Sequence, residues 1–412
     1  MDALTTPSNW QRVRLGDIGK PCMCKRVMKH QTTRYGEIPF YKIGTFGNTA
    51  DAFISKKLFL EYKTKYSFPK KGDILISASG TIGRAVIYDG KPAYFQDSNI
   101  VWIDNDETLV KNDFLFYTYS NIKWNTEHTT ILRLYNDNFR NTLIPLPPLN
   151  EQIAIANILS DVDHYLYTLD ALILKKEGVK KALSFELLSQ RKRLKGFNQA
   201  WQKVRLGDIC YLKNGFSFKS DLFKNMGIPI IRISNISSVD NCINTNDLVF
   251  YDPILIDNDY ILKQGDLILA MSGATTGKSC LYNLNKIAYL NQRVGVFRAK
   301  TSFCYDFLVQ FVFSELFTSR LKLILTAGAQ PNISSFDIED FEILLPPLKE
   351  QIAIANILSG LDNEIISLKN KKRQFENIKK ALNHDLMSAK IRVLKKINAP
   401  KVKDKPASQG NP

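Results

Sequence analysis

The segment "PPLNEQIAIANILS" covers Pro147–Ser160, and "PPLKEQIAIANILS" covers Pro346–Ser359. Thirteen of the fourteen positions are identical, and the copies lie 199 residues apart. Proline cannot lie inside a helix but can precede one, so each proline pair predicts the start of a helix. The chain therefore holds the same helix start twice.

Apolar residues follow each proline pair at alternating steps of four and three, which is typical of a heptad seam for helix pairing. Two lysines interrupt each seam. The first seam is Ile155, Leu159, Val162, Leu166, Leu169, Ile173, Lys176, Lys180, Leu183 and Leu187. The second is Ile354, Leu358, Leu361, Ile365, Leu368, Lys372, Phe375, Lys379, Leu382 and Leu386. We expect two long helices that pair with each other, and the order of the segments along the chain favours an antiparallel pair.

Further repeats show that the whole chain is duplicated. "WQRVRLGDI" at 10–18 returns as "WQKVRLGDI" at 201–209, and the glycine-rich segment 71–84 returns loosely at 264–278. Short apolar runs broken by turn residues predict strands and short helices in each half. The predicted fold is α+β: two mixed α/β domains joined by two long helices in an antiparallel coiled coil, with a pseudo-twofold internal repeat. The predicted parts are a first domain (1–145), a helical spacer (146–197), a second domain (198–344), a second spacer (345–396) and a disordered basic tail (397–412).

Charge and composition narrow the class of protein. Lysine and arginine number 56 against 40 acidic residues, a net charge of +16 spread over all 412 residues. Such an excess favours a polyanionic partner, most simply nucleic acid, although a basic tail on an ordinary protein explains part of it. The six cysteines and four histidines are scattered, which argues against a disulfide framework and a metal-dependent catalyst. We see no apolar run of membrane-spanning length and no signal peptide, so we expect a cytoplasmic protein.

With its repeated "LPPLNEQIAIANIL" and "LPPLKEQIAIANIL" segments and its paired "VRLGDI" openings, the chain resembles the specificity (S) subunit of type I restriction-modification systems. The resemblance covers about Trp10 to Lys396. It implies two target recognition domains that read an asymmetric, bipartite site in double-stranded DNA. It also implies that Pro147–Leu159 and Pro346–Leu358 contact two methyltransferase (M) subunits, through which restriction (R) subunits join. S-adenosylmethionine, ATP and Mg would then belong to these partner subunits, with no cofactor on this chain.

Equivalent loops in the two domains supply candidates for DNA contact. Glycine permits close backbone approach, hydroxyl groups and amides bind phosphate, and Gln, Asn and Arg suit base edges. Ordinary turns between strands are the alternative interpretation. The candidates are Lys42, Thr45, Ser79, Gly80, Thr81, Arg84, Gln96, Asn99, Arg133, Asn136, Arg232, Asn235, Ser272, Gly273, Lys278, Gln292, Arg293 and Asn332.

The repeated helix starts supply candidates for partner contact. Residues off the heptad seam are expected to be free to meet a partner. These are Glu151, Gln152 and Asn157 in the first copy, and Glu350, Gln351 and Asn356 in the second.

No motif assigns catalysis to the chain itself. "SGATTGKS" fails as a phosphate-binding loop because position 272 is serine where the motif needs glycine. "YDPIL" at 251–255 lacks the second proline and the aromatic residue of an adenine methyltransferase site. We therefore expect a noncatalytic subunit. A recognition subunit of a fused nuclease-methyltransferase and a coiled-coil scaffold without DNA binding remain as alternatives.

Overall fold

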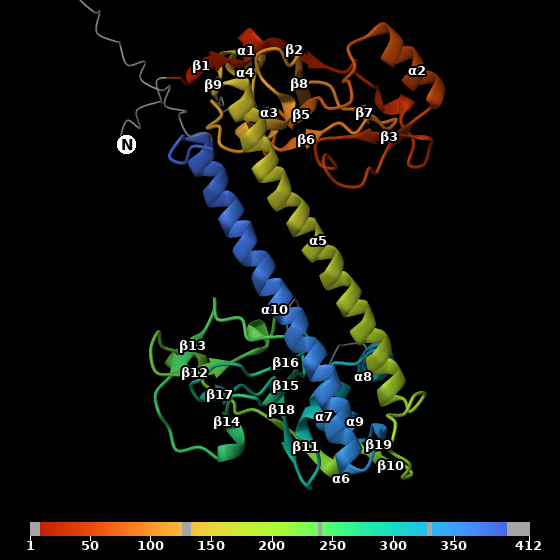
Figure 1. The fold of residues 1–412 in the computed structure, drawn as a ribbon. Helices are drawn as coiled ribbons and strands as arrows, with labels where there is room; N and C mark the ends of the chain where they lie inside the picture. The colour runs from red at the N-terminus through yellow and green to blue at the C-terminus, as the bar shows by residue number, and fades with distance from the viewer. Residues whose placement is uncertain (1–8, 126–132, 238–240, 328–331, 394–412) are drawn as a thin grey trace, which may run out of the picture. The chain divides into compact units, whose positions relative to one another are not determined.

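The computed structural model describes residues 9–125, 133–237, 241–327 and 332–393, so the predicted basic tail lies outside the described residues. The chain forms two compact units (Figure 1). Unit 1 comprises residues 1–168 and 372–412, and unit 2 comprises residues 169–371. The boundary falls inside both long helices, so each unit contains one predicted domain and a segment of each helix.

The first domain, in unit 1, is built on three small sheets. The four-stranded antiparallel sheet has the order β2 (Gly19–Met23), β8 (Ile100–Asn105), β5 (Ile74–Ser77) and β6 (Ala85–Ile87). A three-stranded sheet has the order β4 (Phe53–Ile54), β3 (Ile38–Tyr41) and β7 (Tyr94–Phe95), with β3 parallel to β7. The pair β1 (Gln11–Arg14) and β9 (Leu143–Leu146) closes the domain by joining its two ends.

The second domain, in unit 2, repeats this plan. Its first sheet has the order β11 (Cys210–Asn214), β18 (Val294–Ala299), β15 (Leu267–Ala270) and β16 (Ser279–Leu281). Its second sheet has the order β13 (Val249–Tyr251), β12 (Ile228–Ile231), β17 (Ala288–Leu290) and β14 (Ile261–Leu262). The pair β10 (Gln202–Arg205) and β19 (Glu342–Leu345) closes it. The predicted mixed α/β domains and their internal repeat are confirmed.

Short helices surround these sheets. In unit 1 they are α1 (Leu15–Ile18), α2 (Lys56–Lys65), α3 (Asn112–Tyr119) and α4 (Asn136–Asn141). In unit 2 they are α6 (Leu206–Ile209), α7 (Tyr305–Val312), α8 (Glu315–Ala327) and α9 (Ser335–Glu339). Single turns of 3-10 helix occur at Lys29–Gln31, Ser220–Leu222, Ile233–Asn235 and Asn258–Tyr260.

The two long helices begin where the proline pairs predict. Helix α5 (Leu149–Leu188) and helix α10 (Leu348–Met387) each have 40 residues and start directly after the second proline. Shortly after each helix end a residue adopts a left-handed backbone, Gln190 with φ 62° and Ala389 with φ 56°. A left-handed residue is a common way to end a helix.

The predicted seam faces inward in both units, since none of its positions is exposed. In unit 1, Lys379 of α10 pairs with Asp163 of α5, and the rings of Tyr165 and Phe375 lie 4.6 Å apart. Rising numbers on α5 meet falling numbers on α10, so the segments run antiparallel, as predicted. Knobs-into-holes packing of a coiled coil stays a prediction.

In unit 2 the lysines of the α5 seam also form ion pairs with carboxylates of α10. Lys176 lies 2.8 Å from Glu364, and Lys180 pairs with Asp362. These lysines do more than interrupt the apolar seam, because each is matched by a carboxylate on the facing helix. Complementary charges of this kind favour one register and one direction of pairing.

The start of each long helix belongs to the core of the neighbouring domain. In unit 1, Ile155 and Leu159 of α5 pack with Leu15 and Phe114 of the domain. In unit 2, Ile354 and Leu358 of α10 pack with Phe307. Burying one such side chain contributes roughly 1.5–3 kcal/mol, so each helix start is fixed to its domain. Within the described part of the chain, no helix is long and apolar enough to cross a membrane.

Candidate nucleic-acid interface and repeated junctions

Four loops that the sequence analysis singled out meet in unit 1. The loop after β5 is central. Its backbone at Ala78 donates to the Asn99 carbonyl (2.7 Å) and accepts from the Leu134 amide (2.9 Å). Further along this loop, Arg84 Nη1 donates to the Phe46 carbonyl at 2.9 Å. These bonds bring the segments around residues 46, 80, 99 and 134 together. We call this cluster of loops, and its equivalent in unit 2, the recognition face of the unit.

Unit 2 repeats the arrangement with different residues. In the loop after β15, the Met271 amide donates to the Arg293 carbonyl, and the Met271 carbonyl accepts from the Ile333 amide, both at 2.9 Å. Thr275 Oγ1 donates to the Ile233 carbonyl at 3.0 Å. The sequence therefore located equivalent loops correctly, and the structure brings them together in each domain.

Glycines shape both central loops. Gly83 has φ 84°, and a Cβ there would lie 2.1 Å from Trp124 Nε1. Gly277 has φ 85°, and its Cβ would lie 3.0 Å from the Leu321 side chain. Only glycine combines the left-handed backbone with such close packing, so each loop is fixed by a side chain beneath it.

Most candidate residues for DNA contact remain accessible. Exposed candidates are Gly80, Thr81, Arg84, Arg133, Asn136, Gly273, Gln292, Arg293 and Asn332. Half-buried candidates are Lys42, Thr45, Gln96, Asn99, Arg232, Ser272 and Lys278.

Two candidates are buried, and for them the prediction of a DNA-facing side chain is wrong. Asn235 is fully buried, and its Nδ2 donates to the carbonyls of Asn244 and Asp247. Ser79 is 5% exposed, and its Oγ donates to Asn99 Oδ1 at 2.7 Å. Both hold a loop in place, a role that a polar residue in a turn-like sequence does not reveal.

Several accessible candidates also have bonds inside the domain. Gln96 Oε1 accepts from the Ile43 amide at 2.9 Å, which ties the loop after β7 to the loop after β3. Lys42 pairs with Asp51 at 2.8 Å, and Arg232 with Asp247 at 3.0 Å. These side chains position the loops, whatever else they contact.

Unpaired positive charge remains on both faces. Arg84 and Arg133 in unit 1, and Lys278 and Arg293 in unit 2, form no ion pair among the described residues. The nearby Asp97 is already paired with Arg26 at 2.7 Å. Such a surface attracts a polyanion and makes binding to it dependent on salt.

The sequence analysis missed an exposed aromatic residue on each face. Tyr135 precedes α4 and is 41% exposed, while Phe336 lies in α9 and is 81% exposed. Both belong to segments for which a turn was the alternative interpretation to DNA contact. The available signal was an aromatic residue in the same polar segment as Arg133 or Asn332, because exposed rings suit contacts with bases and sugars.

The described part of the chain contains two buried cysteine thiols with raised pKa values. Burial raises the pKa of the Cys24 thiol to about 12 and that of Cys210 to about 12, so both stay protonated at neutral pH. No group of three or more potential metal ligands occurs among the described residues.

The repeated helix starts form buried junctions. In unit 1, Glu151 Oε2 accepts from Trp10 Nε1 at 3.1 Å, and its Oε1 accepts from Arg392 Nε at 2.7 Å. Gln152 Nε2 donates to the Pro147 carbonyl at 2.9 Å, and its Oε1 accepts from the Lys111 amide at 2.9 Å. The junction thus joins both ends of the first domain to the segment after α10.

Unit 2 contains the same junction. Glu350 Oε2 accepts from Trp201 Nε1 at 2.9 Å and from Arg193 Nη2 at 2.6 Å. Gln351 Nε2 donates to the Pro346 carbonyl at 2.7 Å, and its Oε1 accepts from the Cys304 amide at 2.9 Å. We call each set of Trp, Glu and Arg a junction triad: Trp10, Glu151 and Arg392 in unit 1, and Trp201, Glu350 and Arg193 in unit 2.

The prediction that Glu151, Gln152, Glu350 and Gln351 are free to meet a partner is therefore wrong. All four side chains are at most 3% exposed. The heptad pattern places them off the seam, but the domain encloses the first helical turn on that side as well. Asn157 and Asn356 are exposed and stay candidates.

The exposed part of each repeat is a partly apolar stripe. Leu149, Ile153 and Asn157 lie at steps of four on α5, as do Leu348, Ile352 and Asn356 on α10. Residues four apart lie on one face of a helix. The isoleucines are 46% and 43% exposed, so we call these two sets the repeated stripes.

Comparison with known proteins agrees with the duplicated plan. A putative type I restriction enzyme specificity subunit of Haemophilus influenzae is 64% identical over 148 residues, which cover 36% of this chain and 38% of that protein. The MjaVIII type I restriction enzyme specificity subunit of Methanocaldococcus jannaschii is 29% identical over 421 residues, covering 95% of both chains. The crystal structure of the type I restriction-modification system S subunit from M. genitalium has a similar fold, with a TM-score of 0.61, 16% identity, and coverage of 93% of this chain and 97% of that one.

The family comparison covers both halves separately. The model of the type I restriction modification DNA specificity domain matches residues 7–176 and residues 198–377. Each match begins before a closing strand pair and extends into a long helix, so it includes one domain, one repeated stripe, and the tryptophan and glutamate of one junction triad. The chain therefore belongs to the family of type I restriction modification DNA specificity domains.

Proposed function

We propose that this chain is the DNA-specificity subunit of a type I restriction-modification complex. Each domain reads one half of an asymmetric, bipartite site in double-stranded DNA. One observation carries the proposal: the same loops meet in both domains, but they present different side chains. Arg133 and Tyr135 lie on one face where Asn332 and Phe336 lie on the other. Two unlike readers on one chain suit a target with two unlike halves.

The repeated stripes provide the proposed partner surfaces. Identical residues such as Ile153 and Ile352 are exposed at equivalent places. An apolar residue rimmed by polar ones suits a protein partner, and the duplication suits two copies of one partner. We assign the stripes to two methyltransferase subunits, through which restriction subunits join in the cytoplasm. S-adenosylmethionine, ATP and Mg act on those partner subunits.

Sequencing of methylated bases tests this function. The chain is expressed with its methyltransferase subunit in cells that lack other modification systems. The expected result is new adenine methylation at one asymmetric, interrupted motif, which disappears when this chain is omitted. Absence of any new bipartite motif would refute the proposed function, and methylation of an uninterrupted site would favour another type of recognition subunit.

Single substitutions test the partner surfaces. Ile153→Asp and Ile352→Asp are each expected to remove one methyltransferase subunit from the complex, because a carboxylate is costly to bury against an apolar partner. Native mass spectrometry counts the subunits. Leu174→Asp is the matched control, since Leu174 lies on α5 away from the stripes and is 70% exposed. Full assembly with both isoleucine variants would contradict the assignment.

A further inference from the structure

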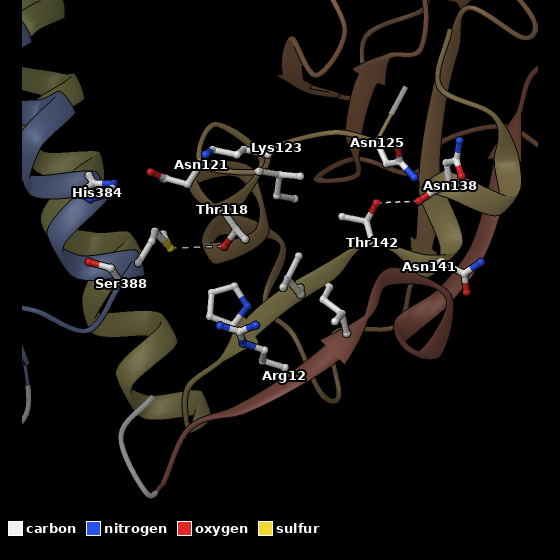
Figure 2. Close-up of a pocket in the computed structure, with 15 residues that line it drawn as sticks. Arg12, Thr118, Asn121, Lys123, Asn125, Asn138, Asn141, Thr142, His384 and Ser388 are labelled. Atoms are coloured by element: carbon white, nitrogen blue, oxygen red, sulfur yellow. Dashed lines mark hydrogen bonds between the residues drawn. The ribbon is translucent and has the colours of Figure 1, made fainter. Parts of the chain in front are cut away.

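A groove in unit 1 runs between the central loop of the recognition face and helix α10. It is a cavity of about 830 Å³ lined by Arg84 of the loop and by Lys380 and His384 of α10, among others. A second cavity of about 560 Å³ shares Asn121 and His384 with it and continues to Lys123. Figure 2 shows this second cavity, with His384 on α10, Ser388 just after the end of α10, and Asn121 and Lys123 on the segment after α3.

The groove has unbalanced positive charge. Arg84, Lys123, Lys380 and His384 are exposed, and none of them forms an ion pair among the described residues. The groove's one carboxylate, that of Glu376, lies 3.5 Å from Lys372. We call these four residues, three of them lysine or arginine and one a histidine, the cationic strip. Its charge is available to an anionic ligand.

The two α10 positions of the strip are not matched at the equivalent, described positions of α5 in unit 2, although the helices derive from the same repeat. The residue equivalent to Lys380 is Lys181, which pairs with Glu315 at 2.7 Å. The residue equivalent to His384 is Phe185, whose ring lies under the Arg191 guanidinium at 4.7 Å. Duplication alone therefore does not explain the strip. At the equivalent positions of the other copy, the lysine is paired with a glutamate and the histidine is replaced by phenylalanine.

We propose that the cationic strip binds the sugar-phosphate backbone of duplex DNA beside the bases that unit 1 reads. The proposal rests on the proposed function and adds a helix of the spacer to the DNA-binding surface. Arg84 belongs both to the recognition loop and to the strip, so the two surfaces are continuous. Lys380 and His384 lie one turn apart on one helical face, about 6 Å along the axis, and both carry N–H donors for phosphate oxygens. The absence of ion-pair partners among the described residues leaves these donors free.

Measuring DNA affinity against salt concentration tests the strip. The chain is assembled with its methyltransferase and bound to a duplex that carries the motif found by methylation sequencing. Lys380→Ala is expected to reduce the slope of log affinity against log salt by about 0.9, the value for one lost phosphate contact, with a several-fold loss of affinity near 0.1 M salt. Lys380→Arg is expected to retain the slope. His384→Ala is expected to weaken binding without relaxing the methylated motif, because phosphate contacts carry no direct sequence information.

The second unit supplies the matched control. Lys181→Ala removes a lysine at the equivalent helix position, but one whose charge is already paired, so the slope is expected to stay as in the wild type. If the wild-type assembly binds the duplex but Lys380→Ala changes neither the slope nor the affinity, this proposal is overturned while the proposed function stands. Loss of a protein subunit from the Lys380→Ala assembly, with the DNA slope unchanged, would also overturn it and assign the strip to a protein. A wild-type assembly that binds no duplex would overturn the proposed function itself.

Discussion

The two units are alike at their buried junctions and differ at the loops of their recognition faces. Both contain the same junction triad, with a glutamate that accepts from a tryptophan and pairs with an arginine. Their recognition faces share a backbone arrangement but present different side chains, such as Arg84 in one and Lys278 in the other. The chain thus separates the residues that hold each domain to its helices from the loop residues that we propose to read DNA.

Burial explains this division. A buried carboxylate such as Glu350 needs all its partners, and removing one leaves an uncompensated polar or charged group. A loop residue such as Arg293 has water as an alternative partner and can change without loss of the fold. The duplicated junction therefore keeps both domains attached to the helices in the same way while the loops vary.

Removing a junction glutamate is expected to have the largest effect. Glu350→Ala leaves Arg193 and the Trp201 N–H without their acceptor, and breaking a buried pair in this way costs about 3–5 kcal/mol of unfolding free energy. Glu151→Ala is expected to cost a similar amount in unit 1. Denaturant unfolding of the full chain, followed by circular dichroism, measures both.

An exposed pair is the control for this prediction. Lys203 and Glu342 lie 2.7 Å apart with both side chains more than half exposed, so Lys203→Ala is expected to cost less than about 1 kcal/mol. If Glu350→Ala and Lys203→Ala lowered the unfolding free energy equally, the junctions would not be what stabilises each unit.

The helix-pairing carboxylates come next. Asp163 accepts from the Tyr117 hydroxyl at 2.9 Å and pairs with Lys379 in unit 1. Asp362 accepts from Gln310 Nε2 at 2.9 Å and pairs with Lys180 in unit 2. Either Asp→Ala change is expected to cost about 1–3 kcal/mol, since it leaves a hydrogen-bond donor and a lysine unmatched. Hydrogen exchange in the two helices measures the local loss of stability. If one of the two substitutions had this effect and the other had none, the equivalence of the two units would be contradicted.

Residues of the recognition faces are expected to act on one half of the target each. Arg293→Ala should weaken binding to the motif by about 1–3 kcal/mol and relax the half read by unit 2. Arg133→Ala should do the same for the half read by unit 1. Sequencing of methylated bases in cells with each variant separates the two, and relaxation of the same half by both variants would be incompatible with two separate readers.

The smallest effect concerns a side-chain helix cap that α9 of unit 2 has and the equivalent helix α4 of unit 1 does not. Ser334 Oγ accepts from the Asp337 amide at the start of α9, whereas Tyr135 at the start of α4 makes no such bond. Ser334→Ala is expected to lower the unfolding free energy of unit 2 by about 1 kcal/mol. Tyr135→Ala removes no such capping bond, so it is expected to lower the unfolding free energy of unit 1 by less. Denaturant unfolding of the two variants side by side measures the difference, and equal losses would contradict the assigned cap.

The sequence predicted the helix starts, the seam and the equivalence of the loops in the two halves, because each depends on local signals. It did not predict that these loops meet in space. Proline pairs fix where α5 and α10 begin, and heptad spacing fixes which positions face inward. It could not predict the burial of Glu151 and Gln152, because a helical period says nothing about a domain that encloses the first turn. Nor could it reveal that Asn235 bonds inward, since buried and exposed asparagines in turns look alike in sequence.

The central claim is that two separate readers are attached through equivalent junctions, and a domain exchange tests it most directly. In the exchanged chain, residues 10–146 replace residues 201–345, joining at the closing strand pairs that have the same register in both domains. Methylation sequencing of cells that express this chain with the methyltransferase is expected to show a symmetric, interrupted motif. Both halves of that motif should match the half read by unit 1. Continued methylation of the original asymmetric motif, or a second half unrelated to the first, would contradict the account.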